Sequence, residues 1–71
     1  MHTLVHFVDS NHQVEQVVLD SGRTYYLAQF KKWNGIGYYY ANYRSGRLPR
    51  SFSNFRAAYN HIAHSLHSAG L

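Results

Sequence analysis

Several residue types are missing or rare in this chain of 71 residues. It has no cysteine, which excludes a disulfide framework, a thiol nucleophile and cysteine-bound zinc. It has three acidic residues, so paired carboxylates for acid–base catalysis are scarce. No run approaches 18 apolar residues, and the N-terminal residues lack the basic start and long apolar core of a signal peptide. We therefore expect no membrane partner and a cytoplasmic location, or the host cytoplasm for a phage-encoded protein.

The charges that are present are distributed unevenly. Residues 1–22 hold all three acids and no lysine or arginine, whereas residues 23–71 hold all seven lysines and arginines and no acid. The two parts therefore carry formal charges of −3 and +7, which add to the net charge of +4. Such an asymmetry is typical of a protein that binds a polyanion or an acidic partner. The alternative is the scattered charge of an ordinary, mildly basic protein.

Four segments rich in β-branched and aromatic residues predict β-strands. They span residues 3–8, 14–19, 23–33 and 36–44. Turn-forming residues separate them at 9–12, at 20–22 and at Asn34-Gly35, and Gly22 suits a left-handed position. Tight turns between successive strands predict an antiparallel meander.

The Asn34-Gly35 pair is the strongest local signal in the chain. A two-residue type I′ turn needs positive φ at both central positions, which Asn and Gly tolerate best. This turn would pair Trp33 with Ile36. One face of the hairpin would then be aromatic and basic, with Tyr25, Gln29, Lys31, Trp33, Tyr38, Tyr40, Asn42 and Arg44. The other face is mostly apolar, with small alanines where a helix could approach.

After residue 51 the hydrophobic period changes to that of a helix. One apolar stripe consists of Phe55, Tyr59, Ile62 and Leu66, with Ala58 and Ala63 beside it. Ser53 is the expected N-cap and Gly70 the expected stop, so the helix spans about residues 54–68. The sequence thus predicts an α+β fold with a four-stranded antiparallel β-meander and one C-terminal α-helix on one face, in two layers.

We expect these elements to form one complete small domain over residues 1–71. The helix would cover the hairpin face that carries Ala28 and Ala41. Leu66→Asp would then unfold the protein by placing a charge in the core. Trp33→Ala would leave the fold intact, because Trp33 would lie on the uncovered face.

The uncovered sheet face and the arginines that follow it are the candidate binding site. Rings beside Lys and Arg suit single-stranded nucleic acid, because bases stack on rings while cations neutralise phosphates. A basic sheet face can also enter the major groove of DNA. The candidate nucleic-acid or partner-binding residues are Lys31, Trp33, Tyr38, Tyr40, Arg44, Arg47, Arg50 and Arg56. Tyrosines that serve only as strand formers and a solvated basic loop are the alternatives.

A protein partner is a further alternative, because Tyr, Trp and Arg dominate protein interfaces. Phage and mobile-element products of this size include inhibitors of host defence, among them anti-CRISPR proteins, so an inhibitor or adaptor fits the same features. A second copy of the chain could also bind, through the uncovered face or an edge strand.

No enzyme activity, metal or cofactor is expected. His61, His64 and His67 drift about 60° around the helix at each step, so the three converge poorly on one metal ion. The chain has neither a nucleophile elbow nor a glycine-rich phosphate loop before a helix.

Residues 33–63 resemble, in outline, the plant-type AP2 and integrase-arm DNA-binding domains. Residues 37–44 correspond to their aromatic and basic strand, and residues 51–59 (SFSNFRAAY) to the entry of their helix. Arg56 stands where those families usually have an acid. The resemblance implies that a small antiparallel sheet followed by one helix can bind DNA, although a shared architecture does not establish function.

Overall fold

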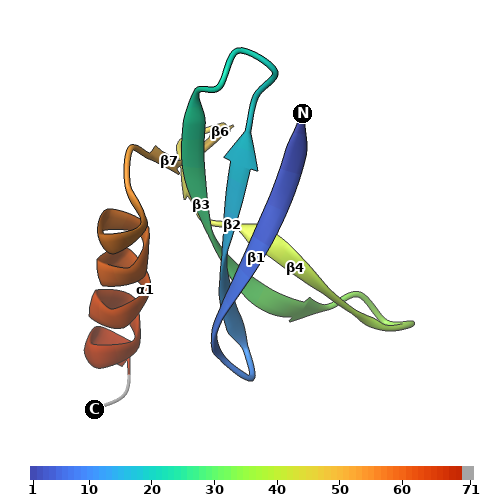
Figure 1. Ribbon diagram of the computed structural model, residues 1–71. Coiled ribbons are helices and arrows are strands. Elements are labelled where there is room, and N and C mark those ends of the chain that lie inside the picture. Colours follow the sequence, from blue (N-terminus) through green and yellow to red (C-terminus); the bar gives the residue numbers. More distant parts are fainter. Residues whose placement is uncertain (70–71) are drawn as a thin grey trace.

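The computed structural model describes residues 1–69, and the expected helix stop at Gly70 lies outside them. The predicted α+β architecture is confirmed: an antiparallel meander carries one C-terminal helix on one face (Figure 1). The main elements are β1 (His2–Asp9), β2 (His12–Val18), β3 (Thr24–Trp33), β4 (Tyr38–Asn42) and α1 (Phe55–Ala69). Each of them begins and ends within two residues of its expected bounds. Among residues 1–69, no helix is long and apolar enough to cross a bilayer.

The first two turns form as their side chains predict. Asp9 Oδ1 accepts hydrogen bonds from the Asn11 backbone N–H at 2.7 Å and from the His12 ring at 2.9 Å. The His12 bond, followed by the Asn11 bond, holds the pKa of Asp9 below its usual value. In the second turn Gly22 takes a φ of 90°, so its expected left-handed conformation is confirmed.

The turn between β3 and β4 differs from the prediction. Trp33 pairs with Tyr38 and not with Ile36, so residues 34–37 form a four-residue loop. Gly35 has a φ of 96°, but Asn34 does not have a positive φ, which excludes a type I′ turn. Instead, Asn34 Oδ1 accepts the N–H groups of residues 36 and 37, both at 2.9 Å. Because the register moves by two residues, the side chains of β3 and β4 keep their predicted faces, whereas Ile36 lies in the loop and not on the strand as predicted.

The chain after β4 is more regular than expected. β4 is shorter than the predicted strand of residues 36–44, and two short strands follow it, β5 (Arg44–Ser45) and β6 (Leu48–Pro49). Gly46 turns between them with a φ of 67°. β7 (Ser51–Phe52) then pairs with β3 beyond the end of β4. β5 and β6 therefore form a separate two-stranded sheet, and only β7 extends the main sheet before the helix begins.

The N-cap of α1 is Asn54, and the prediction of Ser53 is wrong by one residue. Asn54 Oδ1 accepts the backbone N–H of Ala57 at 2.8 Å, which satisfies one of the free donors of the first turn. The first turn contains no acidic residue, and Arg56 lies within it. The positive end of the helix dipole is therefore capped by a neutral side chain alone.

The core lies between α1 and the part of the sheet that carries Ala28, as predicted, but Ala41 is not part of it and lines a hollow beside β4. Its buried members are Val14, Ala28, Ala58 and Ile62, with Val8, Tyr26, Tyr43 and Phe52 packed around them. The alanines on both sides allow the helix backbone to approach the sheet closely. We call this covered side of the sheet the helix face and the opposite side the open face.

The predicted apolar stripe of α1 is only partly buried. Ile62 is fully buried, but Phe55, Tyr59 and Leu66 are each 38% exposed, so the expectation that Leu66 lies in the core is wrong. The helix is rotated so that the small Ala58 faces the sheet. The exposed rings lie toward β1, where Phe55 contacts His6 with 5.3 Å between ring centroids. The periodicity identifies the apolar residues, but it does not tell which of them the narrow sheet covers.

Candidate nucleic-acid interface

The free end of the β3–β4 hairpin brings together aromatic and basic side chains on the open face. The rings of Trp33 and Tyr38 lie with their centroids 4.9 Å apart and tilted by 57°. Lys31 Nζ lies 5.5 Å from the centroid of the Tyr38 ring, in cation–π range. Tyr40 pairs with Lys31 across the strands and is half-buried. We call these four residues the hairpin cluster; the sequence predicted all of them for one face.

The two rings at the end of the cluster are largely accessible. Trp33 is 55% exposed and Tyr38 is 69% exposed. Both side chains come from the first cross-strand pair after the loop, so the hairpin holds them at a fixed separation. The arrangement offers flat apolar surfaces with a cation beside them, which can stack on a planar group and neutralise an anion.

A row of amide side chains crosses the same face, and sequence reasoning missed it. Gln29 is only 7% exposed although it lies on the open face. Its Oε1 accepts from Gln13 Nε2 at 2.6 Å, and its Nε2 donates to Asn42 Oδ1 at 2.8 Å and to Glu15 Oε1 at 3.3 Å. The row links β2, β3 and β4 and fixes their register beside the cluster. These four residues lie side by side only in the observed pairing of β2, β3 and β4, so the row could not be predicted from the sequence alone.

Glu15 limits the part of the open face that can hold an anion. It pairs with Leu27 on β3, whereas Lys31 lies four residues further along the same strand. A phosphate beside the Glu15 carboxylate would be repelled. Anion binding is therefore confined to the half of the face that contains the hairpin cluster.

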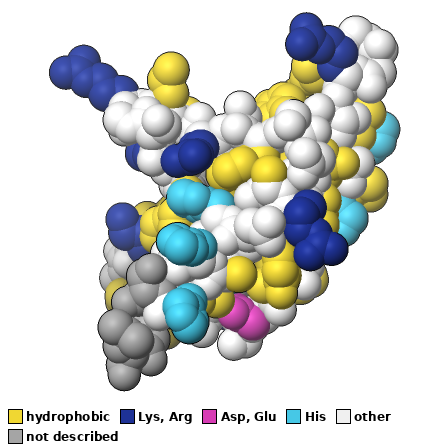
Figure 2. All heavy atoms as spheres, turned by 90° about the vertical axis from the view of Figure 1, so that its left-hand side faces the viewer, with side chains coloured by type: hydrophobic (Ala, Val, Ile, Leu, Met, Phe, Trp, Pro, Cys, Tyr) yellow, Lys and Arg dark blue, Asp and Glu magenta, His cyan; other side chains and the backbone are white. Residues whose placement is uncertain are grey.

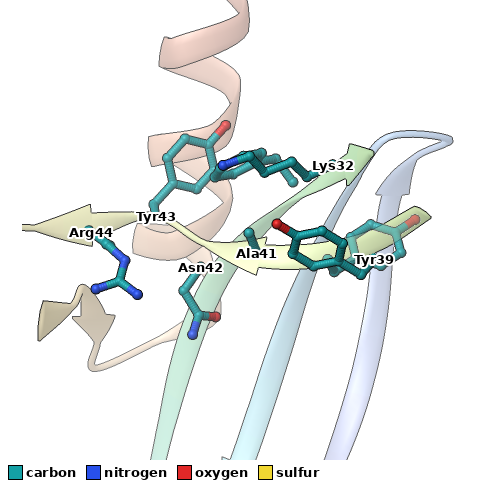
Figure 3. Close-up of a pocket in the computed structure, with 8 residues that line it drawn as sticks. Lys32, Tyr39, Ala41, Asn42, Tyr43 and Arg44 are labelled. Carbon is teal, nitrogen blue, oxygen red and sulfur yellow. The ribbon is translucent and has the colours of Figure 1, made fainter. Parts of the chain in front are cut away.

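Arg44 continues the open face beyond β4. Figure 3 shows Asn42 and Arg44 pointing to one side of the chain and Tyr43 to the other. Arg44 is exposed, and its Nη1 donates to the backbone carbonyl of Arg47 at 2.9 Å. Arg47 lies in the turn between β5 and β6. These two arginines can therefore extend a basic path from the cluster.

The other two predicted arginines lie near α1 and do not join the hairpin cluster. The Arg50 guanidinium lies 5.4 Å from the centroid of the Phe52 ring. Burial, then the charge of Arg50 and then that of His64 lower the pKa of His61, whose ring packs edge-on against Tyr43 with centroids 4.9 Å apart. Arg56 is exposed in the first turn of α1.

Of the eight predicted site residues, the structure thus groups four, which are Lys31, Trp33, Tyr38 and Tyr40. Arg44 and Arg47 follow β4 in the small β5–β6 hairpin, and Arg50 and Arg56 lie near α1. On the side of the molecule that carries α1, lysine, arginine and histidine side chains cover much more of the surface than acidic ones (Figure 2).

A hollow of about 620 Å³ lies beside β4 and reaches the helix-face side of the hairpin (Figure 3). Its lining includes Phe30, Lys32, Tyr39, Tyr40, Ala41, Asn42, Tyr43 and Arg44. Among the described residues, no carboxylate contributes to this lining. The sequence did not single out this side, although Lys32 pairs with Tyr39 there as Lys31 pairs with Tyr40 on the open face.

No known protein family, curated protein or solved structure matches the chain. Within residues 1–69, no three histidine or acidic side chains group closely enough to hold a metal ion. The fold and the site define a small α+β protein with an exposed aromatic and basic hairpin, and its function has to be argued from that geometry.

Proposed function

We propose that the protein binds nucleic acid through the hairpin cluster and that it prefers unpaired strands. The observation that carries this proposal is the exposed pair of rings, Trp33 and Tyr38, with Lys31 beside them. Bases that are free of a duplex can stack on these rings, whereas paired bases are already stacked on one another. Arg44 and Arg47 then meet the phosphates that follow.

The surroundings of the cluster support a polyanionic partner. Lys31 lies four residues along β3 from Leu27, the partner of Glu15, and Arg44 lies on the same side of the chain as Asn42. The buried amide of Gln29 fixes the strands beneath the cluster, so little ordering is needed on binding. No enzymatic group has to be invoked, and binding alone is the proposed activity.

Two neighbouring tyrosines offer a matched test of the proposal. Tyr38 is 69% exposed on the open face, and Tyr39 is 42% exposed on the helix-face side of the same hairpin. Because base stacking on a ring contributes about 1–3 kcal/mol, Tyr38→Ala should weaken binding of a single-stranded oligonucleotide roughly ten-fold or more. Tyr39→Ala should leave the affinity close to that of the unaltered protein.

Trp33 is the single tryptophan of the chain, so its fluorescence reports on this site alone. We expect quenching when a base stacks on the indole, and a titration then gives the affinity of each variant. Equal losses in Tyr38→Ala and Tyr39→Ala, or an affinity that Tyr38→Ala does not change, would contradict the assignment of the open face. A duplex that binds as tightly as the single strand would contradict the preference for unpaired bases.

A protein partner is the second candidate, and we infer it from the tip of the same hairpin. Ile36 is 92% exposed there, and an apolar side chain at a loop tip contributes nothing to binding phosphate. An inhibitor or adaptor would use Ile36, Trp33 and Tyr38 together as a contact. Capture of one defined protein that survives nuclease and high salt, and that is lost in Ile36→Ala, would favour this function over the first.

A further inference from the structure

β1 is the most exposed strand of the sheet. Apart from His6 and Val8, which are half-buried, all of its residues are exposed, and Phe7 is 73% exposed. β1 ends the strand order and, among the described residues, pairs with β2 alone. Its outward backbone N–H and C=O groups and its apolar side chains are therefore available to another strand.

This edge has few of the features that protect natural sheet edges from pairing. Protection usually comes from lysine, proline, an inward charge, a short strand or a bulge. β1 is eight residues long, and no lysine, arginine, proline or acid occurs between His2 and Val8. Its one irregularity in register lies at its end, between Phe7 and Asp9. The exposed, uncharged run of residues 2–8 is thus a template for strand addition.

We propose that the occupant is a second copy of this chain, paired antiparallel along β1 about a two-fold axis that passes between the two Val5 residues. This register places Thr3 opposite Phe7 on the open face and Leu4 opposite His6 on the helix face. Each pair joins like faces, so the two sheets continue as one. A register shifted by one residue would join the open face of one copy to the helix face of the other.

Charge favours a second copy at this edge over an acidic or basic partner. The run of residues 2–8 is uncharged when its histidines are neutral, so two copies meet there without like-charge repulsion. The lysines of the hairpin belong to β3, which is separated from β1 by β2, so neither lysine lies on the strand that makes the contact.

The half-exposed rings of α1 extend the same surface. Phe55 packs on His6 and stacks on Tyr59 with ring centroids 6.0 Å apart. Leu4 of the second copy would arrive opposite His6, next to this pair. The exposed apolar side chains beside the contact lie on both faces of the sheet and together offer up to roughly 600 Å², compared with the roughly 800 Å² that each partner contributes to a typical stable interface. Those on the helix face are Leu4, Phe55, Tyr59 and Leu66, and those on the open face are Val5 and Phe7.

The arrangement would place two hairpin clusters on the same side of one continuous sheet, at its far ends. A nucleic-acid strand long enough to reach both would bind with added avidity. The pairing itself rests on β1 and α1 and does not depend on what the hairpin cluster binds.

The mass of the protein in solution, measured by sedimentation equilibrium over a range of concentrations, tests the proposal. We expect the mass of two chains, dissociating on dilution, for the unaltered protein. Val5→Lys sets two ammonium groups against each other at the axis and should give the mass of one chain with an unchanged circular dichroism spectrum. Ile36→Lys adds the same charge at the far hairpin and should remain a dimer. The mass of one chain for the unaltered protein at every concentration, or for both lysine variants, would overturn the proposal.

A cross-link tests the register even if Val5→Lys does not fold. Because the chain has no cysteine, Val5→Cys introduces a single thiol. In oxidised glutathione the two thiols at the axis should form an intermolecular disulfide in high yield, because directly opposite residues lie within its Cα–Cα range. Ile36→Cys, which is more exposed, should cross-link only at the rate of random collision. Equal rates for the two variants, or a dimer mass that persists in Val5→Lys, would reject β1 as the contact.

Discussion

At the scale of single residues, alternation along the strands decides which side chains can act together. Tyr38 and Tyr39 are neighbours in sequence but face opposite sides of the hairpin. The sequence predicted this correctly although it gave the loop two residues instead of four, because a register shift by two leaves the faces unchanged. It could not predict the burial of Gln29, which depends on partners contributed by the two neighbouring strands, β2 and β4.

His61 provides a residue-scale prediction on pH. Burial and the charges of Arg50 and His64 lower its folded-state pKa below the usual 6.5, so the folded protein favours neutral imidazole. The unfolded chain binds the proton more readily, and stability is therefore lost as pH falls from about 6.5 through the folded pKa. We expect the free energy of unfolding, measured with urea, to decrease between pH 7 and pH 5. The decrease should be smaller in His61→Gln.

His67→Gln is the control for this prediction, because His67 is exposed near the end of the same helix. It should retain the pH dependence of the unaltered protein. If His61→Gln and His67→Gln follow the same curve, the acid sensitivity does not come from His61.

At the scale of elements, the periodicity of apolar residues predicted where the helix lies in the sequence but not which of its sides faces the sheet. The sequence predicted that the helix exists, and each of its predicted ends lies within one residue of the observed end. It did not predict the rotation, because the closest approach to the sheet is made by the small Ala58 and not by the large rings. The strands β5 to β7 were missed because a run of two residues carries no alternating pattern.

The rotation of α1 can be tested with two truncations of similar size. Ile62 is fully buried and Leu66 is 38% exposed. Ile62→Ala should reduce the free energy of unfolding by about 2–5 kcal/mol, since it leaves a cavity in the core. Leu66→Ala should cost less than half as much when measured at a protein concentration low enough for a single chain.

Urea denaturation of both variants gives the comparison directly. A larger loss for Leu66→Ala than for Ile62→Ala would mean that the originally expected stripe faces the sheet after all. Leu66→Asp should accordingly remain folded, in contrast to the expectation from periodicity alone.

At the scale of the whole molecule, the uneven charge of the sequence becomes an uneven surface. The acidic N-terminal part forms β1 and β2, where Asp9 bonds His12 and Glu15 accepts from Gln29. The lysines and arginines come from the rest of the chain, and Lys31 lies beside the exposed Tyr38 ring. The fold could be predicted because its turns and periods are local. The sequence could not predict that Arg50 lies apart from the hairpin cluster, because its contact with the Phe52 ring forms only in the folded chain.

The central claim, that the hairpin cluster holds a nucleic-acid strand, is tested most directly by the salt dependence of binding. The measurement is Trp33 fluorescence during titration with a single-stranded oligonucleotide of roughly ten nucleotides. If Lys31, Arg44 and Arg47 each contact a phosphate, the affinity should fall roughly 20-fold between about 50 and 200 mM salt. Absence of binding at the lower salt concentration, or an affinity that salt does not change, would contradict the account.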